Sequence, residues 1–149
     1  MRFASKTPFL HFAVRLALAI LLVAASQAAA PPAVAGDVLY VICHPSVLVS
    51  PEELRDVFLG EKQFAGGVRI TPADNRAAQT VFLERVLKMA AAKYSTSWTK
   101  KSFRDGVNPP PMKGSDAETI EFVRHQVGAC SYVTTAPGSG VNIVLNSTA

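Results

Sequence analysis

The chain has 149 residues, of which 49% are hydrophobic and 17% charged, so its composition is that of a folded protein rather than a disordered one. Three of its 15 basic residues, but none of its 11 acidic residues, lie in the first 35 positions, which leaves 12 basic and 11 acidic side chains in residues 36–149. This balance argues against nucleic-acid binding, although the whole chain has a pI of about 9.3.

Residues 1–35 have the pattern of a cleavable secretory signal peptide. Arg2, Lys6 and Arg15 precede a ten-residue apolar core at 16–25, and alanines at 28–30 and 33–35 offer cleavage sites. The alternative is a membrane anchor, but a span needs roughly 20 apolar residues. We therefore predict a periplasmic protein with no membrane attachment after cleavage and with one domain at 36–149.

The first half of the domain is predicted to alternate strands and helices. Val38–Cys43 is apolar without alternation, which is typical of a strand buried on both faces. Ser50, Pro51 and Glu53 begin a short helix by their capping pattern, and Gly60 ends it. Residues 68–71 form a short strand, and after a loop at 72–75 an amphipathic helix is expected over 76–89.

The second half is predicted to begin with a helix over 91–104, which carries Trp98 as a core residue. The prolines at 109–111 then require an extended loop. Ser115 and Glu118 open another helix, with Val123 and Val127 facing inward. Strands are expected at 129–133 and 141–145, followed by a frayed tail. The alternating order predicts an α/β fold with a mostly parallel sheet flanked by helices.

Three segments resemble the second lobe of the phosphate-binding proteins of ABC-type uptake systems. In that family a valine-rich strand precedes a helix reading Leu-Arg-Asp-Ile-Phe-Leu-Gly, and a later strand reads Gly-Ala-Ile-Gly-Tyr-Val. Here residues 41–46 end the strand, residues 54–60 read Leu-Arg-Asp-Val-Phe-Leu-Gly, and residues 128–133 read Gly-Ala-Cys-Ser-Tyr-Val. The resemblance implies a single-lobe member of the type II periplasmic-binding-protein fold, with inorganic phosphate as the ligand class.

The resemblance also indicates where an oxyanion would bind. The family carries Ser-Gly-Thr before its long helix, and Arg76-Ala77-Ala78 stands there in this chain, without the two hydroxyls. A helix N-terminus still offers amide donors and a partial positive charge, and an arginine can add a bidentate contact. The candidate ligand-binding residues are Asn75, Arg76, Ala77, Ala78 and Thr80. The alternative is a helix cap at Asp74 or Asn75 with Arg76 on the surface.

Other candidate chemistry is sparse in this sequence. Cys43 and Cys130 each lie in an apolar strand, and they are either a disulfide or two buried thiols. Cys43 and His44 are adjacent in a strand and point to opposite faces, which disfavours a catalytic dyad. Histidines and carboxylates with metal-ligand spacing are absent, as are cofactor-binding motifs, so we expect no metal, no cofactor and no enzymatic activity.

Two functions remain open at this stage. One is an exported, non-catalytic phosphate- or oxyanion-binding protein associated with ABC-type uptake. The other is a periplasmic protein-interaction module that has kept the fold and lost the ligand, with either another protein or a second copy of this chain as its partner. Lys100, Lys101, Arg104 and Lys113 flank the proline loop and could form a basic rim for an anion or for an acidic partner, and the alternative is a solvated helix face.

Overall fold

The computed structural model describes residues 38–148, so the predicted signal peptide at 1–35 lies outside the described residues. The elements of the first half are β1 (Val38–Cys43), the 3-10 turn η1 (Pro51–Glu53), α1 (Leu54–Phe58), β2 (Phe64–Ala65), β3 (Val68–Arg69), β4 (Thr71–Pro72) and β5 (Asp74–Asn75). They are followed by α2 (Gln79–Phe82), the π-helical turn η2 (Leu83–Leu87), α3 (Ala91–Asp105), β6 (Met112–Lys113), α4 (Asp116–His125), β7 (Ala129–Val133) and β8 (Asn142–Thr148).

The main sheet has four strands in the order β4-β7-β1-β8. Strand β1 is antiparallel to both β7 and β8, and only β4 and β7 pair in parallel. The α/β class is therefore confirmed, but the prediction of a mostly parallel sheet is wrong. An unbroken apolar run reports that both faces of a strand are covered, and it does not report the direction of the neighbouring strands.

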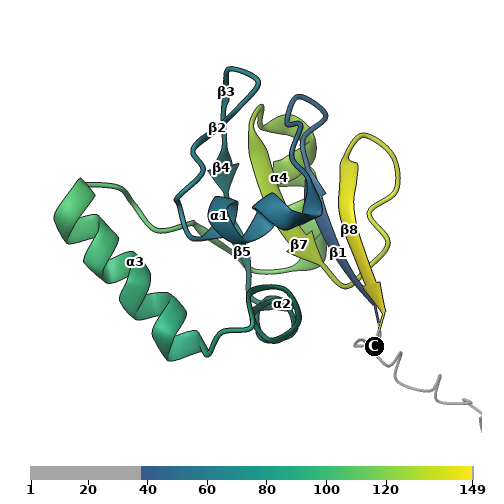
Figure 1. Cartoon of the computed structure of the whole chain (residues 1–149). Coiled ribbons are helices and arrows are strands. Elements are labelled where there is room, and N and C mark those ends of the chain that lie inside the picture. The colour runs from purple at the N-terminus through teal and green to yellow at the C-terminus, as the bar shows by residue number, and fades with distance from the viewer. Residues whose placement is uncertain (1–37, 149) are drawn as a thin grey trace, which may run out of the picture. The chain divides into compact units, whose positions relative to one another are not determined.

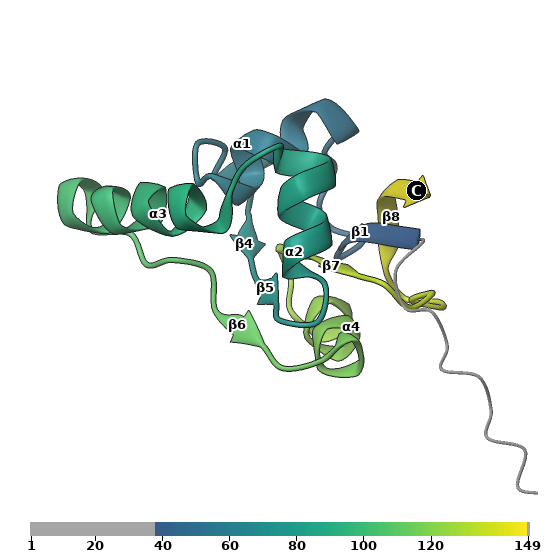
Figure 2. The same ribbon diagram turned by 90° about the horizontal axis from the view of Figure 1, so that it is seen from below.

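Helices cover both faces of this sheet, with α1 and α2 on one face and α4 on the other (Figures 1 and 2). Leu39, Val41 and Cys43 of β1 pack with α1, α2 and α3, whereas Ile42 packs with Val123 of α4. Strand β1 thus divides its side chains between two cores in strict alternation, as a pleated strand requires.

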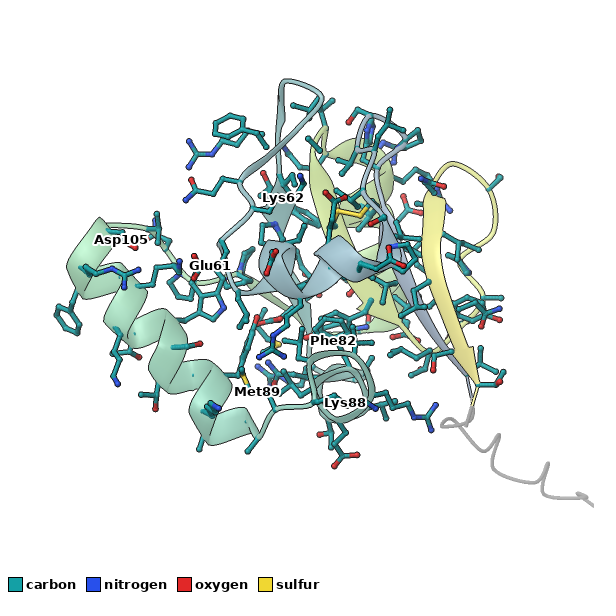
Figure 3. The ribbon with its side chains drawn as sticks, viewed as in Figure 1. Glu61, Lys62, Phe82, Lys88, Met89 and Asp105 are labelled. Carbon is teal, nitrogen blue, oxygen red and sulfur yellow. A yellow bond between two sulfur atoms is a disulfide. The ribbon has the colours of Figure 1, made fainter. Side chains whose placement is uncertain are left out.

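Phe58, Phe82 and Tyr132 form the centre of the larger core. The ring of Phe82 stacks on Tyr132 at 3.9 Å between centroids and meets Phe58 edge-on at 4.6 Å. All three side chains are fully buried, and Phe82 lies where α2 meets the sheet (Figure 3). Phe58 of α1 and Phe82 of α2 are thus the side chains by which these two helices pack on the sheet.

The predicted helix over 76–89 is shorter than expected. It begins at Gln79, because residues 76–78 form a turn, and it ends at Leu87 in a π-helical turn. Lys88 then adopts the left-handed conformation with φ of 52°, which breaks the run before α3. The Arg55 guanidinium donates to the Leu87 carbonyl and so satisfies one backbone group at this irregular end.

Two expectations near the C-terminus are wrong. Val127 was expected inward on α4, but the helix ends at His125 and Val127 is 58% exposed. The tail expected to fray from position 146 belongs to β8, which pairs with β1 as far as Thr148.

Gly128 makes the turn before β7 with φ of 84°, and a Cβ there would lie 2.0 Å from the Arg69 carbonyl oxygen, so only glycine fits.

Cys43 and Cys130 are joined by a disulfide, which decides between the two alternatives that the sequence leaves open. The two residues face each other directly across β1 and β7, with their Cα atoms 4.1 Å apart. Both side chains are fully buried. The bond therefore joins the two central strands of the sheet at the end nearest the His44 turn.

Candidate functional site

Two regions with different chemistry meet at β5. Asp74 and Asn75 are neighbours on this strand, and both side chains are at least 96% buried. Asn75 contacts a group that we call the Asp116 cradle, made of Asn75, Asp116, Thr134 and Thr135. Asp74 lies at a cavity that we call the Asp74 pocket, between α3 and the extended segment at 106–112.

The predicted oxyanion residues lie at the start of α2, but their donors are engaged within the chain. The Ala77 amide donates to the Asn75 side-chain oxygen at 3.1 Å, and the Ala78 amide donates to the Asn75 carbonyl at 3.1 Å. Arg76 and Thr80 are exposed at the surface, whereas Ala78 is fully buried. The two amides assigned to an anion from the sequence are therefore bonded to Asn75 in the turn that precedes α2.

The Asp116 cradle holds a carboxylate from its own chain. Asp116 Oδ1 accepts a hydrogen bond from Asn75 Nδ2 at 2.6 Å. Its Oδ2 accepts from the Thr134 amide at 2.9 Å, the Thr134 hydroxyl at 2.9 Å and the Thr135 amide at 2.8 Å. Backbone amides and hydroxyls are the donors that bind an oxyanion, and here all four converge on the Asp116 carboxylate.

These bonds favour the charged form of Asp116. Partial burial alone would raise the pKa of its carboxyl group, but the hydrogen bonds from Asn75, Thr135 and Thr134 outweigh that effect and lower the pKa. Asp116 also begins α4, where a negative charge is favourable next to the helix N-terminus. The cradle is therefore a site that is already occupied by an anionic group.

Asp74 has the opposite environment. The hydroxyl of Tyr94 donates to its two oxygens at 3.0 and 3.2 Å, and the hydroxyl of Tyr132 donates to Oδ1 at 2.9 Å. None of the ion pairs among residues 38–148 includes Asp74, although its side chain is only 4% exposed. A buried carboxylate with neutral donors and no basic partner is costly to ionise.

The pKa values of this cluster follow from that burial. Desolvation raises the pKa of Asp74, and the hydrogen bonds from Tyr132 and Tyr94 offset it only in part. The pKa values of Tyr94 and Tyr132 are raised as well, first by desolvation and then by the neighbouring Asp74 charge. Both phenols therefore stay protonated around neutral pH and can donate hydrogen bonds to Asp74.

The Asp74 pocket has a volume of about 510 Å³, which is in the range of small-molecule sites. Tyr94 and Trp98 line it from α3, and Pro109, Pro110 and Met112 line it from the segment that runs from α3 toward β6 (Figure 2). Its surface is mainly apolar, and among its lining residues Asp74 alone carries a formal charge. The cavity thus combines aromatic and apolar walls with one buried acid.

Three of the basic residues flanking the proline loop line one hollow together with Glu61, namely Lys100, Lys101 and Arg104, whereas Lys113 is not among its lining residues. Lys101 is buried, and its Nζ atom pairs with Glu61 Oε1 at 2.8 Å. Glu61 lies beside α3 (Figure 3). Arg104 pairs with Asp105 at 2.7 Å, and Lys113 lies over the Phe122 ring at 4.3 Å. Each of these three cations is thus matched separately. The exposed Lys100 lines the same hollow as Lys101 and Arg104, and the carboxylate of Glu61 lies there with them.

The described residues offer few other reactive groups. His44 Nδ1 lies 2.7 Å from the Ser46 hydroxyl, and it also accepts a hydrogen bond from the Ser46 amide at 3.1 Å. Within residues 38–148, no three histidine, cysteine, aspartate or glutamate side chains gather as a metal site would require. No helix in this part of the chain has both the length and the apolar character needed to span a bilayer.

Sequence reasoning placed the candidate site one residue away from the acid that lines the cavity. It considered Asp74 only as one of two alternative helix caps, whereas the Asp74 carboxylate points to Tyr94 and Tyr132, which are 20 and 58 positions further along the chain. The sequence offers one weak signal for a buried acid here, namely that Asp74 lies between two segments with apolar residues. Comparison with models of known protein families gives no match, and comparison with curated proteins gives no significant match.

Proposed function

We propose that this protein is an exported, non-catalytic binding protein that acts as a protein-interaction module and no longer captures a free oxyanion. The observation that carries the proposal is the Asp116 cradle, in which four donors of the oxyanion-binding type already hold the Asp116 carboxylate. The occupied amides of Ala77 and Ala78 support it, because these two donors are not available to an anion beside Arg76.

Displacing the Asp116 carboxylate with phosphate is unfavourable. The carboxylate is tethered next to its donors, so its effective concentration there is far above that of any free ion. A phosphate bound in its place would also leave Asp116 close by as a like charge. Oxyanion capture in a wild-type protein would therefore need a site that the cradle does not offer.

The proposal is tested by calorimetric titration of the purified protein with phosphate, sulfate and acetate. We expect no saturable heat for the wild-type protein. In Asp116→Ala the four donors lose their carboxylate, so acetate should bind and should raise the thermal midpoint of the variant more than that of the wild type. Asp105→Ala removes an exposed acid elsewhere and serves as the matched control.

Phosphate binding by the wild-type protein that disappears in Arg76→Ala would overturn the proposal and support the oxyanion-binding alternative. That alternative retains the start of α2 as its site, with Arg76 and Thr80 exposed there. The partner in an interaction role is either another periplasmic protein or a second copy of this chain. Sedimentation of the purified protein distinguishes these partners, because self-association depends on its concentration.

The face to search for a partner is the rim of the Asp74 pocket. Phe103 lines the pocket from α3 and is 89% exposed, and Met112 across from it is 42% exposed. A photoreactive residue in place of Phe103 should give a discrete crosslinked product in cells that export the protein. The same residue in place of the exposed Glu84, on η2, should give none. Equal crosslinking from both positions would contradict a specific interface at this rim.

A further inference from the structure

We propose that the Asp74 pocket binds a small organic cation, namely a primary ammonium group on a hydrocarbon body, with the ammonium at Asp74 and the body against Tyr94 and Trp98. The inference does not depend on the interaction role, since a free amine would bind without any partner protein. It also concerns a different site from the Asp116 cradle. It rests on the charge, the hydrogen bonds and the lining of the cavity.

The charge of the pocket favours a cation. Asp74 is the only formally charged residue among those that line it, and no basic side chain of residues 38–148 pairs with it. An ionised carboxylate in such surroundings lacks the partner that buried charges ordinarily have. A ligand that carries a positive charge supplies that partner, whereas an anionic ligand would be repelled.

The hydrogen bonds leave room for one more donor. Asp74 Oδ1 accepts from both tyrosine hydroxyls, whereas from residues 38–148 Oδ2 accepts only the longer branch of the Tyr94 bond, at 3.2 Å. A carboxylate oxygen has two acceptor directions, so Oδ2 retains one for an ammonium N–H. This requirement favours a primary ammonium over a quaternary one, which has no hydrogen to donate.

The walls of the pocket select the rest of the ligand. Tyr94 and Trp98 on α3 supply aromatic surface, and aromatic rings attract both apolar groups and cations. Pro109, Pro110 and Met112 close the opposite side without adding any charge. A volume of about 510 Å³ exceeds what an ammonium group fills, so the ligand must carry an apolar body.

The source of the ammonium group is either a free amine or the lysine side chain of a partner. Both present the same chemistry to Asp74. Phenethylamine serves as the free-amine probe, and Nα-acetyl-lysine methylamide serves as the lysine probe. Tighter binding of the first assigns the pocket to a free arylalkylamine, and tighter binding of the second assigns it to a partner's lysine. Either order supports the proposed recognition of a primary ammonium.

Trp98 provides the measurement, because it is the single tryptophan in the sequence and it lines the pocket. At neutral pH, phenethylammonium should change its fluorescence in a saturable way. Phenethyl alcohol and 3-phenylpropionate have the same ring with a neutral or negative end. We expect each to bind at least tenfold more weakly than phenethylammonium, because the loss of a hydrogen bond between two charged groups lowers an affinity by roughly tenfold or more.

The variant that tests the site is Asp74→Asn, which keeps the shape of the side chain and an oxygen acceptor for the tyrosine hydroxyls. It should weaken phenethylammonium binding at least tenfold and leave the affinity for phenethyl alcohol unchanged. The matched control is Asp105→Asn, which removes the same charge from the exposed end of α3 (Figure 3) and should leave the affinity unchanged within twofold.

The proposal is overturned if the alcohol or the carboxylate binds the wild-type protein as tightly as the amine does. It is also overturned if amine binding survives Asp74→Asn, or if Asp105→Asn weakens it equally. The comparison of the three probes uses the wild-type protein alone, so it remains decisive even if the Asp74 variant fails to fold.

Discussion

Asp74 lies on strand β5 and Asp116 is hydrogen-bonded to Asn75 of the same strand, yet the surroundings of the two carboxylates are opposite in character. Asp116 is half-buried and receives four hydrogen bonds, three of them at one oxygen, so its charge is compensated by the fold itself. Asp74 is almost fully buried and receives bonds only from two neutral phenols. The difference teaches that burial alone does not identify a binding site. What distinguishes Asp74 is a buried charge that lacks compensation and lines a cavity.

The largest expected effect concerns the disulfide, which supports both regions at once. Strand β7 carries Tyr132 of the Asp74 cluster and leads into Thr134 of the cradle, and Cys130 binds this strand to β1. Replacing both cysteines with alanine should lower the free energy of unfolding by about 4 kcal/mol, because the bond closes a loop spanning 87 positions. Denaturant titration measures this loss.

A thiol titration of the unfolded, unreduced protein provides the control and should find no free thiol. Two thiols per chain would contradict the disulfide, and an unchanged denaturation midpoint in the double variant would contradict its stabilising role.

Phe82→Ala should be nearly as severe and should affect the two regions unequally. Phe82 is fully buried and stacks on Tyr132, whose hydroxyl binds Asp74. The loss should be about 3–5 kcal/mol in the free energy of unfolding, for the lost burial and the cavity that remains. In the folded fraction the pocket should lose amine affinity while the cradle bonds persist. Amide exchange that rises at Thr134 and Thr135 as much as around Tyr132 would contradict this separation.

Asp116→Asn should be destabilising at neutral pH by about 1–2 kcal/mol, since its partners are hydrogen-bond donors and the site is partly exposed to water. The pKa of Asp116 is lowered in the folded protein, so its stabilising contribution is present above the ordinary aspartate pKa. That contribution is lost as the pH falls through the lowered folded value. The difference between wild type and variant in urea titrations should therefore shrink in acid, and a constant difference would contradict the cradle.

Asp74→Asn should have the smallest effect and the opposite pH dependence. The pKa of Asp74 is raised in the folded protein, chiefly by desolvation, so its contribution to stability is fully present below the ordinary aspartate pKa. It is lost as the pH rises through the raised folded value. Relative to the variant, the wild-type protein should therefore become less stable as the pH rises between these two values. A wild-type protein that gains stability relative to the variant as the pH rises would contradict the absence of a compensating cation.

Local sequence signals predicted several elements of the fold correctly. Glu53 accepts a hydrogen bond from the Ser50 amide, and Ser115 accepts one from the Glu118 amide, as their capping patterns indicate. The apolar runs at β1 and β7 are strands, and Trp98 is a core residue. Each of these features depends on residues that are close together in the chain.

The features that sequence reasoning missed depend on contacts between distant residues. Strand direction around β1 depends on which strand lies beside it, and that information is not in the strand itself. The π-helical turn at the end of α2 is accompanied by a tertiary bond from Arg55 to the Leu87 carbonyl, 32 positions away. Likewise, Asp116 reaches the cradle because α4 begins beside β5, and no local pattern distinguishes it from an ordinary acidic residue in a first helical turn.

One measurement tests the contrast between the two aspartates most directly, namely a carboxyl-carbon NMR titration of the purified wild-type protein. We expect Asp116 to titrate below the ordinary aspartate range and Asp74 above it. Saturating phenethylammonium should lower the pKa of Asp74, because a bound cation favours the carboxylate, and should leave that of Asp116 unchanged. An Asp74 that titrates in the ordinary range, or a value that does not respond to the amine, would contradict the account.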